Sequence, residues 1–243
     1  MDVSKLKPGD AHYMAYVGPP TQYDFMGATQ FRLLCTLGLG AHHTLLDFGS
    51  WSLRAGRLFM NHLDAGKYFG IDPNKWLIED CIANQLGNDL IHLKKPTFDY
   101  NDDFSVNFDR EFDYIVAQFI FSHTGSDLVK IALPNLLGVL NDKGIIAMTF
   151  VEGPSSSMEK GWVYPDPGCV EFTPREIREF FRETGVFARK IPWYHPRQSW
   201  YLLAKCKDRL PDASMDSYLR GAVLTDPEFA KSVEGEDRRG VEQ

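Results

Sequence analysis

Short apolar runs alternate with longer amphipathic stretches along most of the chain, and this alternation predicts the fold. The apolar runs end at Gly, Pro or a polar residue and are typical of buried parallel strands; they lie at 44–48, 68–72, 90–93, 112–119 and 145–151. Between and around them, apolar residues recur at helical spacing over 28–37, 53–63, 75–86 and 126–140. Such alternation predicts a parallel sheet with helices on both faces.

The C-terminal part of the pattern changes from alternation to a hairpin. Thr173 and Pro174 mark a helix start, because Thr is a favourable N-cap and Pro suits the first helical position; this helix ends at Gly185. The next apolar runs, 186–191 and 199–204, have no helix between them. We therefore predict an α/β fold with a doubly wound, mostly parallel seven-stranded sheet and an antiparallel last strand.

Three segments are expected along the chain. Residues 1–40 are predicted to form an N-terminal lid and helix, residues 41–205 the main domain, and residues 206–243 a polar tail with one short helix. Within the main domain, the stretch 94–110 is rich in Asp, Asn and Phe without a clear period, so we expect a loop there.

Charge and hydropathy narrow the possible partners. The chain has 33 acidic and 26 basic residues, a net charge of −7, which argues against a general nucleic-acid binder because such a protein needs a basic surface. No apolar run approaches the roughly 20 residues of a membrane helix, and the first residues carry no signal pattern. We expect a cytoplasmic protein without nucleic-acid or membrane partners.

The cysteines do not suggest a metal site or a disulfide framework. Cys35, Cys81, Cys169 and Cys206 form no Cys-x-x-Cys pair, and none lies at zinc-ligand spacing from a histidine. We interpret them as buried or incidental thiols in a reducing compartment and predict no metal ligands.

The ligand edge of the predicted sheet carries two features. Ligands of such sheets bind outside the carboxyl ends of the strands, next to the first strand. There, the turn after the first strand begins at Asp47 and contains Gly49, which lets the backbone turn tightly with a ligand close by. Asp72 ends the second strand, where a carboxylate in an open cleft can accept hydrogen bonds from both hydroxyls of a ribose.

The stretch 45–84 resembles the cofactor-binding half of class I S-adenosylmethionine-dependent methyltransferases. Residues 47–51 are similar to the family's first motif, D/E-x-G-x-G, and 52–54 continue it with Ser-Leu-Arg, as in a subgroup of the family. Residues 70–74 resemble the second motif, 112–116 the fourth strand, and the terminal hairpin the last two strands. The resemblance covers about residues 23–205. It implies a methyltransferase that uses S-adenosylmethionine.

The resemblance also implies a role for individual residues in cofactor binding. The turn would lie under the methionine part of the cofactor; its residues are Asp47, Gly49, Ser50 and Trp51. Asp72 would hold the ribose, and Pro73 would touch the adenine ring.

Residues from other parts of the chain would complete this site. An acid after the third strand would meet the adenine amino group; Asp99, Asp102 and Asp103 compete for this role, and we favour Asp103 because Phe104 follows it. Gln118 and Phe119 would border the cofactor from the end of the fourth strand, and the segment around Tyr23 and Gln30 would form a lid.

Trp51 departs from the family's motif, because it stands where the second glycine is expected. The interpretation that we favour is a tolerated variant whose indole turns away from the cleft. The other is an indole that fills the site, which would make the chain a non-catalytic binding or scaffold protein on a methyltransferase fold. A nicotinamide-type site is less expected, because G-x-G-x-x-G is absent after the first strand.

Catalysis of methyl transfer depends mainly on positioning, because the reaction is an in-line displacement at a sulfonium. A general base is needed only when the acceptor must lose a proton. The candidates for this base are His123, after the fourth strand, and Glu152, at the end of the fifth. His195, in the turn of the terminal hairpin, is expected to be a surface residue.

The acceptor pocket is expected to be aromatic and to take a small molecule, with oxygen as the favoured acceptor atom. We predict that its walls come from the loop 152–170 and its neighbours; the aromatic and apolar candidates are Trp162, Tyr164, Pro165, Phe119, Phe121 and Trp193. Nucleic-acid N-methyltransferases of this fold often carry Asn/Asp-Pro-Pro-Tyr after the fourth strand. This chain has Gln-Phe-Ile-Phe at 118–121 instead, which argues against a nucleic-acid substrate.

Overall fold

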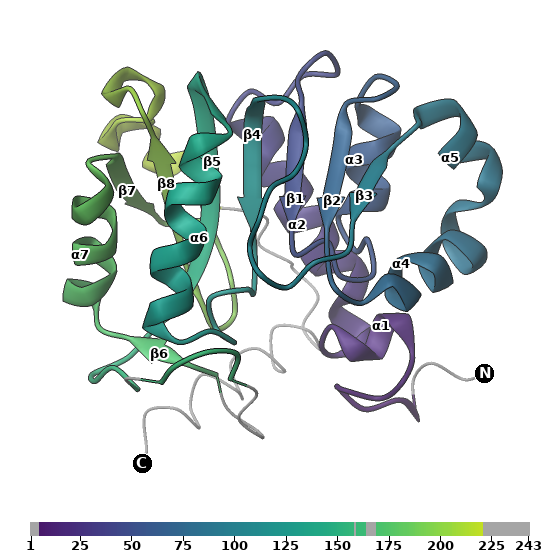
Figure 1. Ribbon diagram of the computed structural model, residues 1–243, viewed down its shortest axis with the longest axis horizontal. Helices are drawn as coiled ribbons and strands as arrows, with labels where there is room; N and C mark the ends of the chain where they lie inside the picture. The colour runs from purple at the N-terminus through teal and green to yellow at the C-terminus, as the bar shows by residue number, and fades with distance from the viewer. Residues whose placement is uncertain (1–4, 158, 164–168, 221–243) are drawn as a thin grey trace.

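The computed structural model describes residues 5–157, 159–163 and 169–220, and it shows a sheet covered by helices on both faces (Figure 1). The strands are β1 (Leu45–Phe48), β2 (Tyr68–Ile71), β3 (Thr97–Asp99), β4 (Phe112–Ala117), β5 (Leu140–Glu152), β6 (Glu171–Phe172), β7 (Phe187–Ile191) and β8 (Ser199–Ala204). The helices are α1 (Tyr13–Tyr16), α2 (Tyr23–Thr36), α3 (Gly56–His62), α4 (Lys75–Cys81), α5 (Asn88–Lys94), α6 (Ser126–Gly138) and α7 (Pro174–Thr184).

The strand order confirms the predicted fold class. Strands are hydrogen-bonded in the order β3-β2-β1-β4-β5-β8-β7, and β6 adds a two-residue strand beside β5. The pairs from β3 to β5 are parallel, whereas β8 runs antiparallel to both β5 and β7. The order reverses between β1 and β4, which is the switch point where ligands bind in sheets of this kind.

The sheet separates two layers of the hydrophobic core, and the side chains of β1 point alternately into one layer and the other. Leu46 and Phe48 face the side that α6 and α7 cover, whereas Leu45 faces α2, α3 and α4 (Figure 1). Every residue of β1 is buried, because helices cover both faces of the strand. The short α1 lies near the carboxyl ends of β1 and β2, at the bottom of Figure 1.

The predicted third strand is wrong. Residues 90–93 belong to α5, and β3 lies in the stretch 94–110 that we expected to be a loop. A short apolar run does not distinguish a strand from a helix. Leu93 is 70% exposed on α5, and β3 is an edge strand with no buried residue, so neither segment shows the pattern of a buried strand.

The first part of the predicted tail is packed on the domain. Residues 206–220 contain two short 3₁₀ helices, Lys207–Arg209 and Ala213–Ser217. Arg189 of β7 anchors them, because its guanidinium donates to the carbonyl of Asp212 at 2.7 Å and forms an ion pair with Asp216. Residues 221–243 of the expected tail lie outside the described residues.

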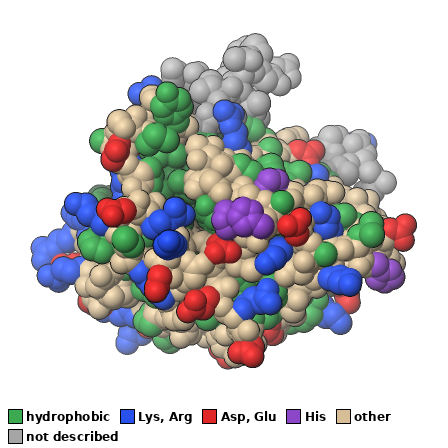
Figure 2. Space-filling view, turned by 90° about the horizontal axis from the view of Figure 1, so that it is seen from above, with side chains coloured by type: hydrophobic (Ala, Val, Ile, Leu, Met, Phe, Trp, Pro, Cys, Tyr) green, Lys and Arg blue, Asp and Glu red, His purple; other side chains and the backbone are tan. Residues whose placement is uncertain are grey.

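The surface at the amino ends of the parallel strands carries charges of both signs. Figure 2 shows acidic, basic and histidine side chains mixed on this face, which lies at the top of Figure 1, without a separate basic stripe. In the part of the chain that the structure describes, no helix combines the length and the apolar character needed to span a bilayer.

A close contact between α2 and the turn before α3 provides a test of this packing. A Cβ on Gly27 would lie 2.4 Å from the backbone oxygen of Arg54. We expect Gly27→Ala to lower the free energy of unfolding by about 1–3 kcal/mol, as overpacking does. Gly138→Ala is the matched control, because a Cβ there meets nothing within 4 Å and should stabilise α6 slightly. Urea unfolding of both variants measures the difference, and equal stabilities would contradict the close approach.

Candidate active site

Two cavities meet at the carboxyl ends of β1, β2 and β4. The large cavity has a volume of about 320 Å³; its lining consists of Pro8, Gly9, Tyr16, Val17, Gly18, Pro19, Gln22, Met26, Trp51, Arg54, Phe119, His123, Cys169, His195, Pro196 and Arg197. The small cavity has a volume of about 30 Å³; its lining consists of Phe48, Gly49, Trp51, Ile71, Asp72, Pro73, Asn74, Asn101, Asp102, Phe104, Ile120 and Trp162. Trp51 is the residue that belongs to both linings, so it forms the wall between them.

The turn between β1 and α3 has an unusual backbone. Gly49, Trp51 and Leu53 have φ angles of +79°, +49° and +55°. Trp51 therefore keeps the left-handed conformation that a glycine adopts freely, at a cost of about 1–2 kcal/mol for a residue with a Cβ. Gly49 is favoured at its position for two reasons: its φ of +79° strains other residues, and a Cβ would lie 1.9 Å from Cδ1 and 2.7 Å from Cγ1 of Ile120.

The indole of Trp51 lies in the site, so the expectation that it turns away from the cleft is wrong. A Cβ on Gly49 would be 3.4 Å from the indole nitrogen, which places the indole beside this glycine. The ring also packs near His123, with centroids 6.1 Å apart, and near Tyr16 at 6.5 Å. The space over Gly49 is thus filled by Trp51 and Ile120.

Asp72 lines the small cavity but does not face an open cleft. Its side chain is buried, and its two oxygens accept hydrogen bonds from the backbone N–H groups of Trp51 and Asn74, each at 2.8 Å. Burial raises the pKa of this carboxyl, and the hydrogen bonds oppose the shift. Asp72 therefore holds the turn in shape from the end of β2, and Pro73 lies beside it in the same lining.

The acid next to the small cavity is not Asp103. The carboxylate of Asp103 is exposed and accepts the backbone N–H of Ser105 at 2.9 Å, outside the lining. Asn101 and Asp102 line the cavity instead. The oxygen Oδ1 of Asn101 is buried and has no hydrogen-bond partner among the described residues, so this lining holds an acceptor that a ligand could satisfy.

Phe104 and Trp162 close the small cavity. Their rings stack with centroids 5.0 Å apart, and the indole N–H of Trp162 donates to the carbonyl of Asp102 at 3.1 Å. The sequence predicted Trp162 and Phe119 in the wall of one pocket. In the structure, Trp162 lines the small cavity and Phe119 lines the large one, on the other side of Trp51. Tyr164 and Pro165 lie outside the described residues.

Four other residues that the sequence predicted for the site are buried and line neither cavity. Gln118 and Ser50 are buried beside the site but line neither cavity. Phe121 stacks on Phe150 in the core, and Trp193 is buried in the other core layer, so neither of these predicted pocket residues lines the large or the small cavity.

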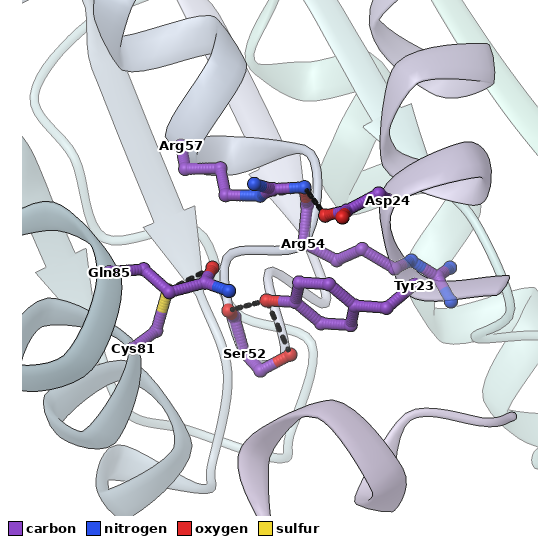
Figure 3. A network of polar contacts seen from close by, with 7 residues as sticks. All are labelled: Tyr23, Asp24, Ser52, Arg54, Arg57, Cys81 and Gln85. Atoms are coloured by element: carbon purple, nitrogen blue, oxygen red, sulfur yellow. Dashed lines mark hydrogen bonds and ion pairs between the residues drawn. The ribbon is translucent and has the colours of Figure 1, made fainter. Parts of the chain in front are cut away.

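The predicted lid is displaced along the chain. Tyr23 and Gln30 are buried and line no cavity, whereas the preceding residues 16–19 line the large one. Figure 3 shows the hydroxyl of Tyr23 directed at Ser52, whose carbonyl accepts it at 2.9 Å. Arg54 donates from Nη1 to the carbonyl of Val17 at 3.2 Å, and burial lowers its pKa to about 10, so it stays cationic at neutral pH. These contacts join the N-terminal segment to the turn.

His123 lines the large cavity, and its role as a general base stays a prediction. It is half-buried between the rings of Trp51 and Phe119, with the Phe119 centroid 5.4 Å away. Burial lowers the pKa of His123, so the imidazole is neutral at pH 7 and can accept a proton. Phe119 has a φ of +67°, and its backbone N–H donates to Thr149 at 3.0 Å.

Glu152 is not brought to the cavity, which corrects its prediction as a catalytic candidate. Its carboxylate forms an ion pair with Lys190 at 2.7 Å and accepts the hydroxyl of Tyr201. Both partners come from the strands β7 and β8, so Glu152 joins β5 to the terminal hairpin rather than facing a ligand.

His195 lines the large cavity, although its place in the hairpin turn predicted a surface residue. Its Nδ1 accepts the backbone N–H groups of Arg197 and Gln198 at 3.1 and 3.0 Å. Burial lowers the pKa of His195 to about 3, with further lowering from Arg54 and Arg197. The direction of β7 could have revealed this position, because a strand parallel to β1 delivers the turn that follows it to the ligand edge.

Asp47 lies beneath the turn and is fully buried. The hydroxyl of Tyr68 donates to its carboxylate at 2.7 Å. Burial raises the pKa of Asp47 to about 7, and the nearby Asp72 adds to this shift, whereas Tyr68 and Arg54 oppose it. Asp47 therefore supports the turn and lines neither cavity.

Among comparisons with known proteins, solved structures identify the fold. No family model matches the chain, and no curated protein matches its sequence. Among solved structures, DhpI in complex with SAH has a TM-score of 0.55 at 14% identity, covering 75% of this chain and 86% of that chain. The glycopeptide N-methyltransferase MtfA, complexed with (S)-adenosyl-L-methionine, has a TM-score of 0.57 at 9% identity, covering 74% and 94%.

A third similar structure is the magnesium protoporphyrin IX methyltransferase ChlM from Synechocystis PCC 6803 with bound SAH. It has a TM-score of 0.55 at 10% identity and covers 76% of this chain and 84% of that chain. At such identities the likeness shows the fold. The chain thus has the Rossmann-like fold of S-adenosylmethionine-dependent methyltransferases, in agreement with the fold that the sequence resemblance implied.

The buried Asp47 makes the stability depend on pH. A carboxyl whose folded pKa of about 7 exceeds its usual value of 3.8 stabilises the fold when protonated, and this contribution is lost as pH rises through 7. Between pH 3.8 and pH 7, we expect Asp47 to lower the free energy of unfolding of wild type by up to about 1.4 kcal/mol per pH unit. Asp47→Asn should remove that slope, because the amide oxygen still accepts the Tyr68 hydroxyl. Thermal unfolding at pH 5 and pH 8 measures the difference, and parallel pH profiles for both proteins would refute it.

Proposed function

We propose that this chain transfers the methyl group of S-adenosylmethionine to a small-molecule acceptor that binds in the large cavity. The observation that carries the proposal is the meeting of two cavities at Trp51, on the edge of the sheet where ligands of this fold bind. Named methyltransferases with S-adenosylmethionine or its demethylated product among the similar structures support the same assignment.

The small cavity suits the adenosine half of the cofactor in its chemistry. Asp72 would hold the ribose from the end of β2, and Pro73 and Phe104 would contact the adenine. The unpartnered Oδ1 of Asn101 and the carboxylate of Asp102 are the acceptors available to the adenine amino group. A volume of about 30 Å³ is below the range of about 300–1,000 Å³ that ligand sites occupy. Binding therefore requires Trp162 and Phe104 to move apart.

The methionine half needs the space that Trp51 fills. Gly49 would lie under this half of the cofactor, and the indole of Trp51 lies beside this glycine. Binding thus requires the indole to swing aside, while the backbone of the turn already has the glycine-like conformation. The bound cofactor supplies a methyl group on a positively charged sulfur, which makes the methyl carbon electrophilic.

The large cavity suits a small acceptor, and oxygen is the atom that we favour. Its volume of about 320 Å³ lies within the range of small-molecule sites. A neutral His123 in its wall can accept the proton that a hydroxyl acceptor loses, which contributes typically about 10²–10⁴-fold to such a reaction. Tyr16 and Phe119 provide aromatic walls that position a flat molecule.

The second candidate function is a non-catalytic binding protein that uses the large cavity alone. One observation favours it: the indole of Trp51 fills the space over Gly49 and separates the two cavities. In this case the large cavity still binds its ligand, whereas S-adenosylmethionine has no complete site.

Asp72 tests the cofactor assignment. We expect Asp72→Asn to weaken binding of S-adenosylhomocysteine by about 1.5–3 kcal/mol, because an amide loses an acceptor that a ribose hydroxyl needs. Titration calorimetry measures this loss, and transfer of labelled methyl groups to a panel of small hydroxylated acceptors should fall in parallel. Circular dichroism and thermal unfolding control for the turn, since Asp72 also accepts the N–H groups of Trp51 and Asn74. Equal affinity in wild type and variant would remove Asp72 from the cofactor site.

Trp51 separates the two candidate functions. Glycine adopts the φ of +49° without strain and leaves the space over Gly49 open. We expect Trp51→Gly to bind S-adenosylhomocysteine about tenfold more tightly, or by about 1.4 kcal/mol. A wild type that does not bind, beside a variant that does, would establish the non-catalytic function. Weaker binding in the variant would mean that the indole is part of the bound site, and no binding by either protein would end the methyltransferase proposal.

A further inference from the structure

The large cavity concentrates positive charge in an acidic protein. Arg54 and Arg197 line it, and its described lining contains no Asp or Glu, although the whole chain has a net charge of −7. Both guanidinium groups are close enough to His195 to make its protonation less favourable. Positive charges from two distant parts of the chain, the turn before α3 and the turn before β8, therefore converge on one cavity.

His195 adds a fixed hydrogen-bond donor to this lining. Because Nδ1 accepts two backbone N–H groups, the proton of the neutral imidazole resides on Nε2. Nε2 is buried and has no partner among the described residues. A buried donor without a partner is costly, so this N–H is suited to an acceptor atom that a ligand brings.

Arg54 and Arg197 differ in how they are held. Arg54 is bound to the carbonyl of Val17 through Nη1, so its charge is fixed in the wall. Arg197 is exposed and can adjust to a ligand. Guanidinium groups suit carboxylates and phosphates, because their N–H donors match the geometry of two oxygens.

The rest of the lining is apolar and aromatic. Tyr16, Trp51 and Phe119 contribute rings, and Met26 and Pro196 contribute aliphatic surface. Phe119 lies 6.1 Å from His195 between ring centroids, so an aromatic wall adjoins the donor. A ligand that matches this lining has a flat apolar body and an oxyanion at one end.

We infer that the large cavity selects an acceptor that carries a carboxylate or phosphate on a flat ring, with Arg197 and the Nε2–H of His195 binding the oxyanion. That this ligand is a methyl acceptor rests on the proposed function. The selectivity for anions rests on the lining of the cavity alone. Arg54 would add attraction from the wall beside Trp51, where the ring of the ligand would lie.

One other source could provide the same chemistry, because the methionine part of the cofactor also carries a carboxylate. The two sources are distinguished by pairs of ligands. 4-Hydroxybenzoate and phenyl phosphate are compared with the neutral 4-hydroxybenzamide and phenol as probes of the acceptor site. S-Adenosylhomocysteine is compared with 5′-methylthioadenosine, which lacks the carboxylate, as a probe of the cofactor.

The experiment is titration calorimetry of the full chain with each probe, in wild type, Arg197→Gln and His195→Gln. We expect at least one anionic probe to bind wild type about tenfold or more tightly than its neutral counterpart, as hydrogen bonds to a charged group provide. Arg197→Gln should remove most of this preference and leave the neutral probe unchanged. Arg182→Gln, an exposed arginine of α7 outside the cavity, is the matched control and should keep the preference.

Each remaining outcome decides the matter. Equal binding of anionic and neutral probes, no binding of any probe, or an undiminished preference in both Arg197→Gln and His195→Gln overturns the inference. Arg197→Gln could instead weaken the binding of S-adenosylhomocysteine while the affinities for methylthioadenosine and the acceptor probes stay unchanged. That result assigns Arg197 to the cofactor and also overturns the inference. Anion preference without any binding of S-adenosylhomocysteine supports the inference and ends the proposed methyl transfer instead.

Discussion

The hydrogen bond from the backbone N–H of Trp51 to Asp72 sets the geometry on which the site depends. It joins the end of β2 to the turn after β1, at the point where left-handed backbone angles let the chain fold back toward α3. Asp72 is buried, and its other oxygen holds Asn74 at the start of α4. One carboxylate thus fixes the relative position of two turns, and both cavities are built around them.

Trp51 shows how a backbone shape can persist while the side chain changes the site. Its φ of +49° is the angle that a glycine would take at no cost, so the turn does not depend on glycine for its path. The indole instead becomes the wall that divides one groove into two cavities of very different volume. Under the proposed function, a cofactor and an acceptor must meet across this wall, so the position of the indole would decide whether the two cavities act together.

The sequence predicted the sheet and the ligand edge well, because these depend on local patterns. Buried parallel strands such as β1 and β2 are short, mostly apolar runs, and Gly49 and Asp72 follow them directly. The sequence failed where tertiary contacts decide. The strand β3 lies at an edge and has no buried residue, the Glu152 carboxylate is paired across the hairpin, and the cavity position of His195 depends on where the β7–β8 turn returns. The edge position of β3 and the pairing of Glu152 have no signature in spacing or composition, whereas the predicted hairpin could have placed His195 at the ligand edge.

Electrostatics give the two cavities opposite character. The small cavity is lined by Asp72 and Asp102, and its described lining has no Lys or Arg, whereas the large cavity is lined by arginines without an acid. The sign of the nearby charge therefore reverses across the indole of Trp51. A cationic methyl donor held on the acidic side and an anionic acceptor held on the basic side would attract each other across this boundary. The attraction would be strong where water is excluded, because charges interact more strongly at low dielectric. Under the proposed function, this attraction between donor and acceptor would end with the reaction, since transfer removes the positive charge from the sulfur and leaves a neutral sulfide. The oxyanion of the methylated product would still face Arg197.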